Sequence, residues 1–160
     1  MVSYSEAPWR EVFSRRWGVV TLAESVLTEY RDQLWTTRCC RVKGSHGGRP
    51  HEMYRSSHVQ RFLSFANAAG VEHAIISDRY GLHFPDQCLP SYDLGPWDLS
   101  PEGRRALGRM ITTQAETRGH RAIVVYNNSP LMSRPYLEIL SHSGLAIFFT
   151  TRLPAAGALS

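Results

Sequence analysis

Apolar and polar residues follow one another in blocks along this chain, and the blocks show two periodicities. Four short runs rich in β-branched or aromatic residues predict buried strands, at residues 33–39, 71–77, 121–126 and 145–150. Five segments with apolar residues at helical spacing predict helices, at residues 7–17, 22–30, 56–70, 100–119 and 135–142. Continuously apolar strands that alternate with helices are typical of a parallel sheet with helices on both faces.

These elements predict a single α/β domain with three layers and a mostly parallel sheet of about four strands. We assign residues 1–32 to an N-terminal helical segment, residues 33–153 to the α/β domain and residues 154–160 to a loose tail. Residues 43–50 hold three glycines and residues 78–99 hold three prolines, so both segments are expected to be loops.

The composition is that of a globular protein. The 160 residues suffice for one domain, and 42% hydrophobic with 20% charged residues exclude the disordered class. No apolar run approaches the roughly 20 residues that a bilayer span needs. Charged residues interrupt the N-terminus where a signal peptide would be apolar. We therefore expect a cytoplasmic protein that makes no contact with a membrane.

The net charge bears on the choice of partner, and the cysteine content bears on the cellular compartment. Eighteen Lys and Arg against fourteen Asp and Glu give a net charge of +4, which permits contact with a phosphate-rich partner without requiring it. An odd number of cysteines, two of them adjacent, argues against a disulfide framework and indicates a reducing compartment: Cys39, Cys40 and Cys88. The cysteines and histidines lack zinc-site spacing, so we expect no metal and no cofactor.

Polar residues directly follow three of the predicted strands. They are Cys39-Cys40, Ser77-Asp78-Arg79-Tyr80 and Asn127-Asn128-Ser129. Ligands of parallel sheets bind outside the carboxyl ends of the strands, so three polar ends at one edge predict a binding site. The alternative for each strand end is an ordinary surface loop.

Three residues are candidates for catalysis. Cys40 lies among Arg38, Arg41 and Lys43, whose charges favour a nucleophilic thiolate, although Cys40 can also be a buried core residue. His58 begins a predicted helix and is either a general base beside an anion site or a surface histidine. Asp93 is a second group that can move protons.

The binding candidates follow from their chemistry. Arg79 is a fork for phosphate or carboxylate, while Asp78 is a free carboxylate or a salt-bridge partner of Arg79. Tyr80 and Tyr92 either stack on a base or pack against the proline-rich loop. A further pair either reads the edge of a base or forms the turn that ends the third strand: Asn127 and Asn128.

Three segments carry a resemblance to a known family. The runs Met53–His58, Ile76–Leu82 and Pro90–Asp93 resemble an uncharacterised family of small phage and prokaryotic proteins with a Ser-x-Lys/Arg-Tyr-Gly-Leu segment followed by Pro-x-Tyr-Asp. That family is similar to the peroxide-stress protein YaaA and to the central domain of archaeosine synthase, which modifies a deazaguanine base in transfer RNA. The resemblance implies a uracil-DNA glycosylase-like fold and motif positions at Cys40, Tyr54, Ser57, His58, Tyr92, Asp93 and Trp97.

We therefore expect an α/β protein that binds a nucleobase, a nucleotide or a nucleic acid, with tRNA, DNA or a nucleoside as partner and with action on a modified base as an open question. One alternative is a non-catalytic protein that binds nucleic acid through dispersed arginines. Another is a stress-response or phage protein that binds a protein partner. The binding residues of the leading interpretation are Tyr54, Ser57, Ser77, Asp78, Arg79, Tyr80, Tyr92, Asn127 and Asn128.

Overall fold

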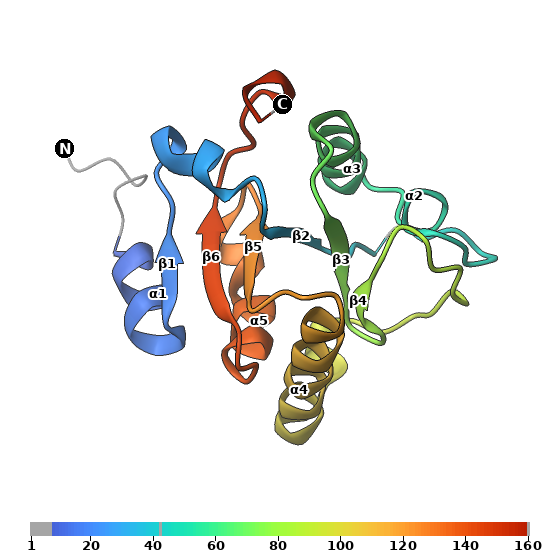
Figure 1. Cartoon of the computed structure of the whole chain (residues 1–160). Coiled ribbons are helices and arrows are strands. Elements are labelled where there is room, and N and C mark those ends of the chain that lie inside the picture. Colours follow the sequence, from blue (N-terminus) through green and yellow to red (C-terminus); the bar gives the residue numbers. More distant parts are fainter. Residues whose placement is uncertain (1–7, 42, 160) are drawn as a thin grey trace.

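A six-stranded mixed sheet organises the computed structural model, which describes residues 8–41 and 43–159 (Figure 1). The strand order is β1-β6-β5-β2-β3-β4, and all neighbours pair in parallel except β3 and β4. The strands are β1 (Val19–Thr21), β2 (Leu34–Arg38), β3 (His73–Ser77), β4 (Gly81–His83), β5 (Ala122–Tyr126) and β6 (Ala146–Thr150).

Helices cover both sides of this sheet. The α-helices are α1 (Trp9–Trp17), α2 (Pro50–Met53), α3 (Ser57–Ala69), α4 (Pro101–Thr117) and α5 (Pro130–Ser141). The described residues also include three short 3-10 helices: η2 (Glu24–Tyr30), η3 (Pro96–Asp98) and η4 (Ala156–Ala158). None of the described helices is long and apolar enough to cross a membrane.

The connections explain which helix lies on which side. The β2-α3-β3 connection moves toward one edge of the sheet and the β5-α5-β6 connection toward the other. Because such crossovers are right-handed, α3 and α5 fall on opposite faces. Helices α1, α5 and α4 pack in a row on one side, and η4 packs against α3 on the other (Figure 1).

The sheet has more strands than the sequence predicted. The four predicted strands are present as β2, β3, β5 and β6, but the prediction of about four mostly parallel strands missed β1 and the antiparallel β4. Strand β1 lies within residues 1–32, which were expected to be helical, and β4 lies within the predicted loop 78–99. Each has only three residues, too few to show the two-residue periodicity of a strand.

Two helix predictions also change. The helix expected at residues 135–142 begins at Pro130, because Ser129 Oγ accepts a hydrogen bond from Met132 N (3.3 Å) and the proline occupies the first turn. The segment 22–30 forms the 3-10 helix η2 rather than an α-helix. In the predicted helix 7–17, Ala7 lies outside the described residues, as do the other residues of 1–7 in the predicted N-terminal segment.

The hydrophobic core lies at the centre of the sheet. Every residue of β3 is buried, and Trp35 on the neighbouring β2 is fully buried. Helix α3 places its apolar stripe on this sheet and ends at Gly70, whose φ of 69° suits a residue without a side chain. The tail predicted to be loose carries Leu159, which is buried with this core.

A side chain from α4 covers the outer edge of β4. Gln114 Oε1 accepts a hydrogen bond from Leu82 N (2.7 Å), and Gln114 Nε2 donates to Tyr80 O (2.7 Å). The amide group therefore pairs with the strand as a neighbouring backbone would. Gly81 makes room for it, since a Cβ there would meet Gln114 Oε1 at 2.5 Å.

Candidate functional site

The strand order places a divergence point at the carboxyl ends of β2 and β5. The chain leaves β2 toward β3 and leaves β5 toward β6, so the two neighbouring strands diverge in their connections. Such a divergence point is where open α/β sheets bind ligands. Cys39 follows β2, Asn127 follows β5, and Asp78 follows β3 on the other side of β2.

Three buried side chains meet at this edge and form what we call the aspartate cluster: Cys39, Asp78 and Tyr136. Cys39 Sγ donates to Asp78 Oδ2 (3.0 Å), Tyr136 Oη donates to the same oxygen (3.3 Å), and the thiol and hydroxyl lie 3.6 Å apart. Burial and the nearby Asp78 carboxylate raise the pKa of the Cys39 thiol to about 12, so Cys39 is a protonated donor rather than a thiolate.

Two buried polar atoms around this cluster have no hydrogen-bond partner among the described residues. One is Asp78 Oδ1 and the other is Asn127 Nδ2. Asn127 Oδ1 accepts from Ser129 N (3.0 Å), which fixes the side chain and leaves its amide donor unused. An unpaired buried polar atom lowers stability by about 1–3 kcal/mol. An acceptor and a donor left unpaired at one edge therefore destabilise the fold.

Burial also sets the ionisation of Asp78. Removal from water raises the pKa of the Asp78 carboxyl above its ordinary value, while the hydrogen bonds from Cys39 and Tyr136 and the charge of Lys43 oppose the rise. The carboxyl group therefore lies closer to neutrality than an exposed aspartate. It can accept a hydrogen bond when ionised and donate one when protonated.

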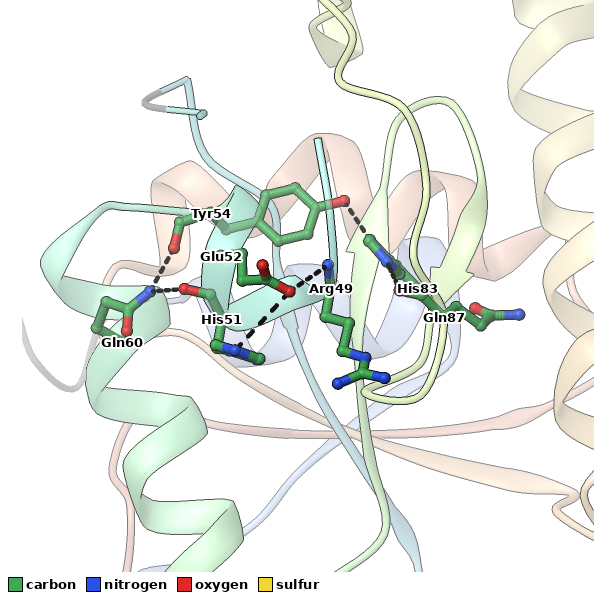
Figure 2. Close-up of polar contacts among 7 residues, drawn as sticks. All are labelled: Arg49, His51, Glu52, Tyr54, Gln60, His83 and Gln87. Carbon is green, nitrogen blue, oxygen red and sulfur yellow. Dashed lines mark hydrogen bonds and ion pairs between the residues drawn. The ribbon is translucent and has the colours of Figure 1, made fainter. Parts of the chain in front are cut away.

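A second polar group, which we call the tyrosine chain, lies beside the first: Ser77, Tyr92, Tyr54 and His83. Ser77 Oγ donates to Tyr92 Oη (2.8 Å), Tyr92 Oη lies 3.5 Å from Tyr54 Oη, and Tyr54 Oη lies 3.0 Å from His83 Nδ1. Figure 2 shows the Tyr54 ring directed toward His83.

The direction of the hydrogen bonds in the tyrosine chain follows from its last acceptor. His83 Nε2 lies 2.8 Å from the carbonyl oxygen of Gln87, which can only accept, so Nε2 carries the proton. His83 Nδ1 then accepts from Tyr54, and Tyr54 in turn accepts from Tyr92. Burial lowers the pKa of His83 and raises the pKa of Tyr54 well above its ordinary value, so both groups stay neutral in this arrangement.

An open depression of about 430 Å³ lies next to the aspartate cluster, in the size range of small-molecule sites. The turn Asp78–Tyr80 forms one side, and apolar residues of the following loop and of α4 form the rest. Its lining is Asp78, Arg79, Tyr80, Leu94, Leu99, Gly103, Ala106, Leu107 and Met110. Tyr80 Oη donates to Pro90 O (2.9 Å), which ties the loop to the turn.

The structure separates the predicted binding residues into two sets. Those that join the two polar groups or the depression are Tyr54, Ser77, Asp78, Arg79, Tyr80 and Tyr92, and Asn127 is buried at the same edge of the sheet, after β5. The side chains of Ser57 and Asn128 are exposed and make no hydrogen bond with any described group. Arg79 does not pair with Asp78, since its guanidinium lies 5.7 Å from the centre of the Tyr80 ring and is exposed.

The three predicted catalytic residues differ in their surroundings. His58 uses both ring nitrogens, one 3.0 Å from Ser56 Oγ and one 3.2 Å from Arg38 O, and burial lowers its pKa. Asp93 is exposed, and no described group pairs with its carboxylate. Cys40 is 7% exposed and lies near Tyr54.

The site residues chosen from the sequence leave out four residues at this edge. Cys39 was named as part of a polar strand end but Cys40 was chosen as the candidate, and Tyr136 was placed in a helix with no link to the site. Lys43 and His83 lay in predicted loops, yet Lys43 Nζ is 4.5 Å from the centre of the Tyr92 ring and His83 ends the tyrosine chain. Recognising Ser129-Pro130 as a helix start would have placed Tyr136 in the turns nearest β5.

The side chains at this edge can form hydrogen bonds in a buried environment. Across the described ranges 8–41 and 43–159, no three His, Cys, Asp or Glu side chains are grouped closely enough to hold a metal ion. Asp78 offers a carboxyl, Asn127 an amide donor, and the depression offers apolar walls. These groups suit a flat, polar-edged ligand.

Comparison with known proteins adds a family and no function. Residues 35–157, more than half of the 160 residues, match the model of a family described as a family of unknown function, DUF6884. No curated protein and no solved structure matches the chain.

Proposed function

We propose that this chain, which belongs to the DUF6884 family of unknown function, binds a nucleobase at the carboxyl edge of its sheet. The observation that carries the proposal is the pair of unpaired buried atoms, Asp78 Oδ1 and Asn127 Nδ2. A base edge presents an N–H donor beside a carbonyl acceptor, which complements one carboxylate acceptor and one amide donor.

The spacing of the strands supports this pairing. Asp78 and Asn127 follow β3 and β5, which lie on either side of β2, so their backbones are about 10 Å apart at the usual strand spacing. Cys39, at the end of β2, lies between them in the strand order, so a base edge that pairs with both would lie over Cys39. Leu99, Leu107 and Met110 supply apolar contact for the ring faces.

Both unpaired atoms are covered in the described state, so binding requires the side chains around them to move. Asp78 already lines the depression, and the gain from pairing each atom, about 1–3 kcal/mol, offsets the cost of that movement. A ligand that pairs with both atoms is therefore preferred over one that pairs with neither.

The resemblance to YaaA and archaeosine synthase extends the proposal. It supports a modified, deazaguanine-type base as the ligand and a uracil-DNA glycosylase-like arrangement of the sheet. We keep the proposal to binding, because His58 is held through both ring nitrogens and Cys39 is a protonated donor. Cys40 is the residue to test first for chemistry on a bound base.

The direct test is a thermal-shift and calorimetric titration with guanosine, uridine and deazaguanosine. We expect at least one nucleoside to raise the melting temperature of the wild-type chain, and Asp78→Asn to lose that shift while it remains folded. The control is Asp86→Asn, an exposed carboxylate that pairs with Arg118 (3.1 Å) outside the site.

A wild-type chain that binds none of the nucleosides would overturn the proposal, as would binding that Asp78→Asn leaves unchanged. In that case the chain is better described as a protein-binding stress-response or phage protein. Loss of binding in Asp86→Asn as well would point to a surface charge effect rather than to the site.

A further inference from the structure

The net positive charge of this chain arises from one segment beside the site. Residues 38–71 hold six Lys and Arg and one carboxylate, a charge of +5, whereas all other residues hold twelve Lys and Arg and thirteen carboxylates, a charge of −1. The net charge of +4 is thus confined to the segment that runs from the end of β2 through α2 and α3. We call its cations the basic lobe: Arg38, Arg41, Lys43, Arg49, Arg55 and Arg61.

The cations of the basic lobe are not neutralised within the described part of the chain. None of the six forms an ion pair there, whereas elsewhere Arg104 pairs with Glu138 and Arg118 pairs with Asp86. The one carboxylate of the segment, Glu52, is occupied by the backbone N–H of Arg49 and lies 3.9 Å from His51. In Figure 2 the Arg49 guanidinium points away from Glu52.

The basic lobe is continuous with the proposed base site. Arg38 ends β2 at the carboxyl edge of the sheet, where its half-buried side chain leaves Nε buried and unpaired. Lys43 lies over the Tyr92 ring and its charge favours the ionised form of Asp78. The other four cations are exposed. Positive charge therefore extends outward from the aspartate cluster to the protein surface.

An exposed aromatic residue lies in the loop that forms part of the depression. Trp97 is 76% exposed and lies between Leu94 and Leu99 in the chain, both of which line the depression. Its turn is held by the bond from Gly95 N to Asp98 Oδ2 (2.8 Å), so the indole is presented on a fixed backbone. A fixed, exposed indole is suited to stacking on a base.

We propose that the ligand is a base within a single-stranded polynucleotide whose phosphodiester backbone lies along the basic lobe. The inference rests on the proposed function and adds the partner to it. Unpaired arginines bind phosphates through their forks, and Trp97 stacks on a neighbouring base while one base enters the depression. An acidic protein would use the cations but leave both the depression and Trp97 without a role.

The test compares two triple charge reversals in oligonucleotide binding. Arg41→Glu/Arg49→Glu/Arg55→Glu alters the basic lobe, and Arg105→Glu/Arg109→Glu/Arg121→Glu makes the same charge change at exposed arginines outside it. Fluorescence anisotropy with labelled single-stranded DNA and RNA, over a series of KCl concentrations, gives affinity and its salt dependence. Melting temperatures verify that both variants fold.

We expect the lobe variant to lose roughly 30-fold or more in affinity and to show a salt slope smaller by about 2, as three lost phosphate contacts on a single strand require. The control variant should stay within about threefold. The thermal shift with nucleosides should be unchanged in both variants, since neither alters the depression.

The outcomes separate this inference from the proposed function. A wild-type chain that binds a nucleoside but no oligonucleotide, equal loss in both triple variants, or equal affinity for duplex DNA would each overturn the inference and leave the base site standing. Oligonucleotide binding that depends on the basic lobe but not on Asp78, without any nucleoside binding, would support the surface and overturn the base site.

Discussion

The two polar groups at the carboxyl edge are neighbours, but only one of them has all its hydrogen bonds satisfied. In the tyrosine chain, each donor from Ser77 to His83 has an acceptor, and the last proton reaches a backbone carbonyl. In the aspartate cluster, Cys39 and Tyr136 converge on one oxygen while Asp78 Oδ1 has no partner. Satisfied polar networks stabilise a fold, whereas unsatisfied ones mark sites where stability has been given up.

The contrast assigns different tasks to residues that are adjacent in sequence. Ser77 accepts hydrogen bonds from the backbone N–H groups of Arg79 and Tyr80 and donates to Tyr92, so it shapes the turn. Asp78, the next residue, is left with an unused oxygen beside the depression. The tyrosine chain is thus the frame that holds the aspartate cluster in place.

Tyr54→Phe should have the largest effect on stability. It leaves His83 Nδ1 without a donor and the Tyr92 hydroxyl without an acceptor, so we expect the free energy of unfolding in urea to fall by about 2 kcal/mol. The control is Tyr30→Phe, since the Tyr30 ring packs on Phe148 and its hydroxyl bonds to no described group. The free energy of unfolding of Tyr30→Phe should fall by no more than about 0.5 kcal/mol. Equal losses in the two variants would show that the tyrosine chain is not a structural frame.

Asp78→Asn should act in the opposite direction. Above pH 3.8 the unfolded chain ionises this carboxyl, while the folded chain, in which its pKa is raised, still holds the proton. Stability of the wild-type chain therefore falls as pH rises through this interval, and the neutral amide escapes the penalty. We expect a gain of about 1 kcal/mol at pH 7 that disappears below pH 3.8, from urea unfolding across a pH series.

The Asp86→Asn control should show no such gain, because Asp86 is exposed and paired with Arg118. A loss of stability at neutral pH in Asp78→Asn would place Asp78 in the frame with the tyrosine chain. The division between the two groups would then be wrong.

Lys43→Met should have the smallest effect and reports on both groups, since the ammonium lies over Tyr92 and favours ionised Asp78. We expect a loss of about 0.5 kcal/mol at neutral pH. In a double-mutant cycle measured by urea unfolding, the loss should become smaller beside Asp78→Asn, where only the contact with the Tyr92 ring remains, and should persist beside Tyr92→Phe, which keeps that ring. A loss that Asp78→Asn leaves unchanged would mean that Lys43 acts on the tyrosine chain alone.

Much of the fold could be predicted because its central elements are long and regular. The strands β2, β3, β5 and β6 and the helices α3 and α4 each carry a clear apolar pattern, and the mostly parallel pairing follows from their alternation. The three-residue strands β1 and β4 carry no such pattern. The start of α5 was missed although Ser129-Pro130 repeats the signal of Ser100-Pro101, which correctly placed α4.

The candidate site was predictable as a place but not as a set of contacts. The polar ends after β2, β3 and β5 follow from the strand pattern, and the pairing of the strands places them at one edge. Which of Cys39 and Cys40 faces Asp78 depends on the orientation of one residue beyond a strand. Tyr136 and His83 enter from elements whose bounds the sequence did not reveal, and so their hydrogen bonds could not be foreseen.

The amide of Gln114 has a consequence for how these molecules behave in a crowded solution. A bare edge strand invites a second chain to add to the sheet, which is a common route to aggregation. By occupying Leu82 N and Tyr80 O, Gln114 closes the β4 side to such growth. The turn beside the depression is thereby protected from self-association, and the depression stays open to a ligand instead of another copy of the chain.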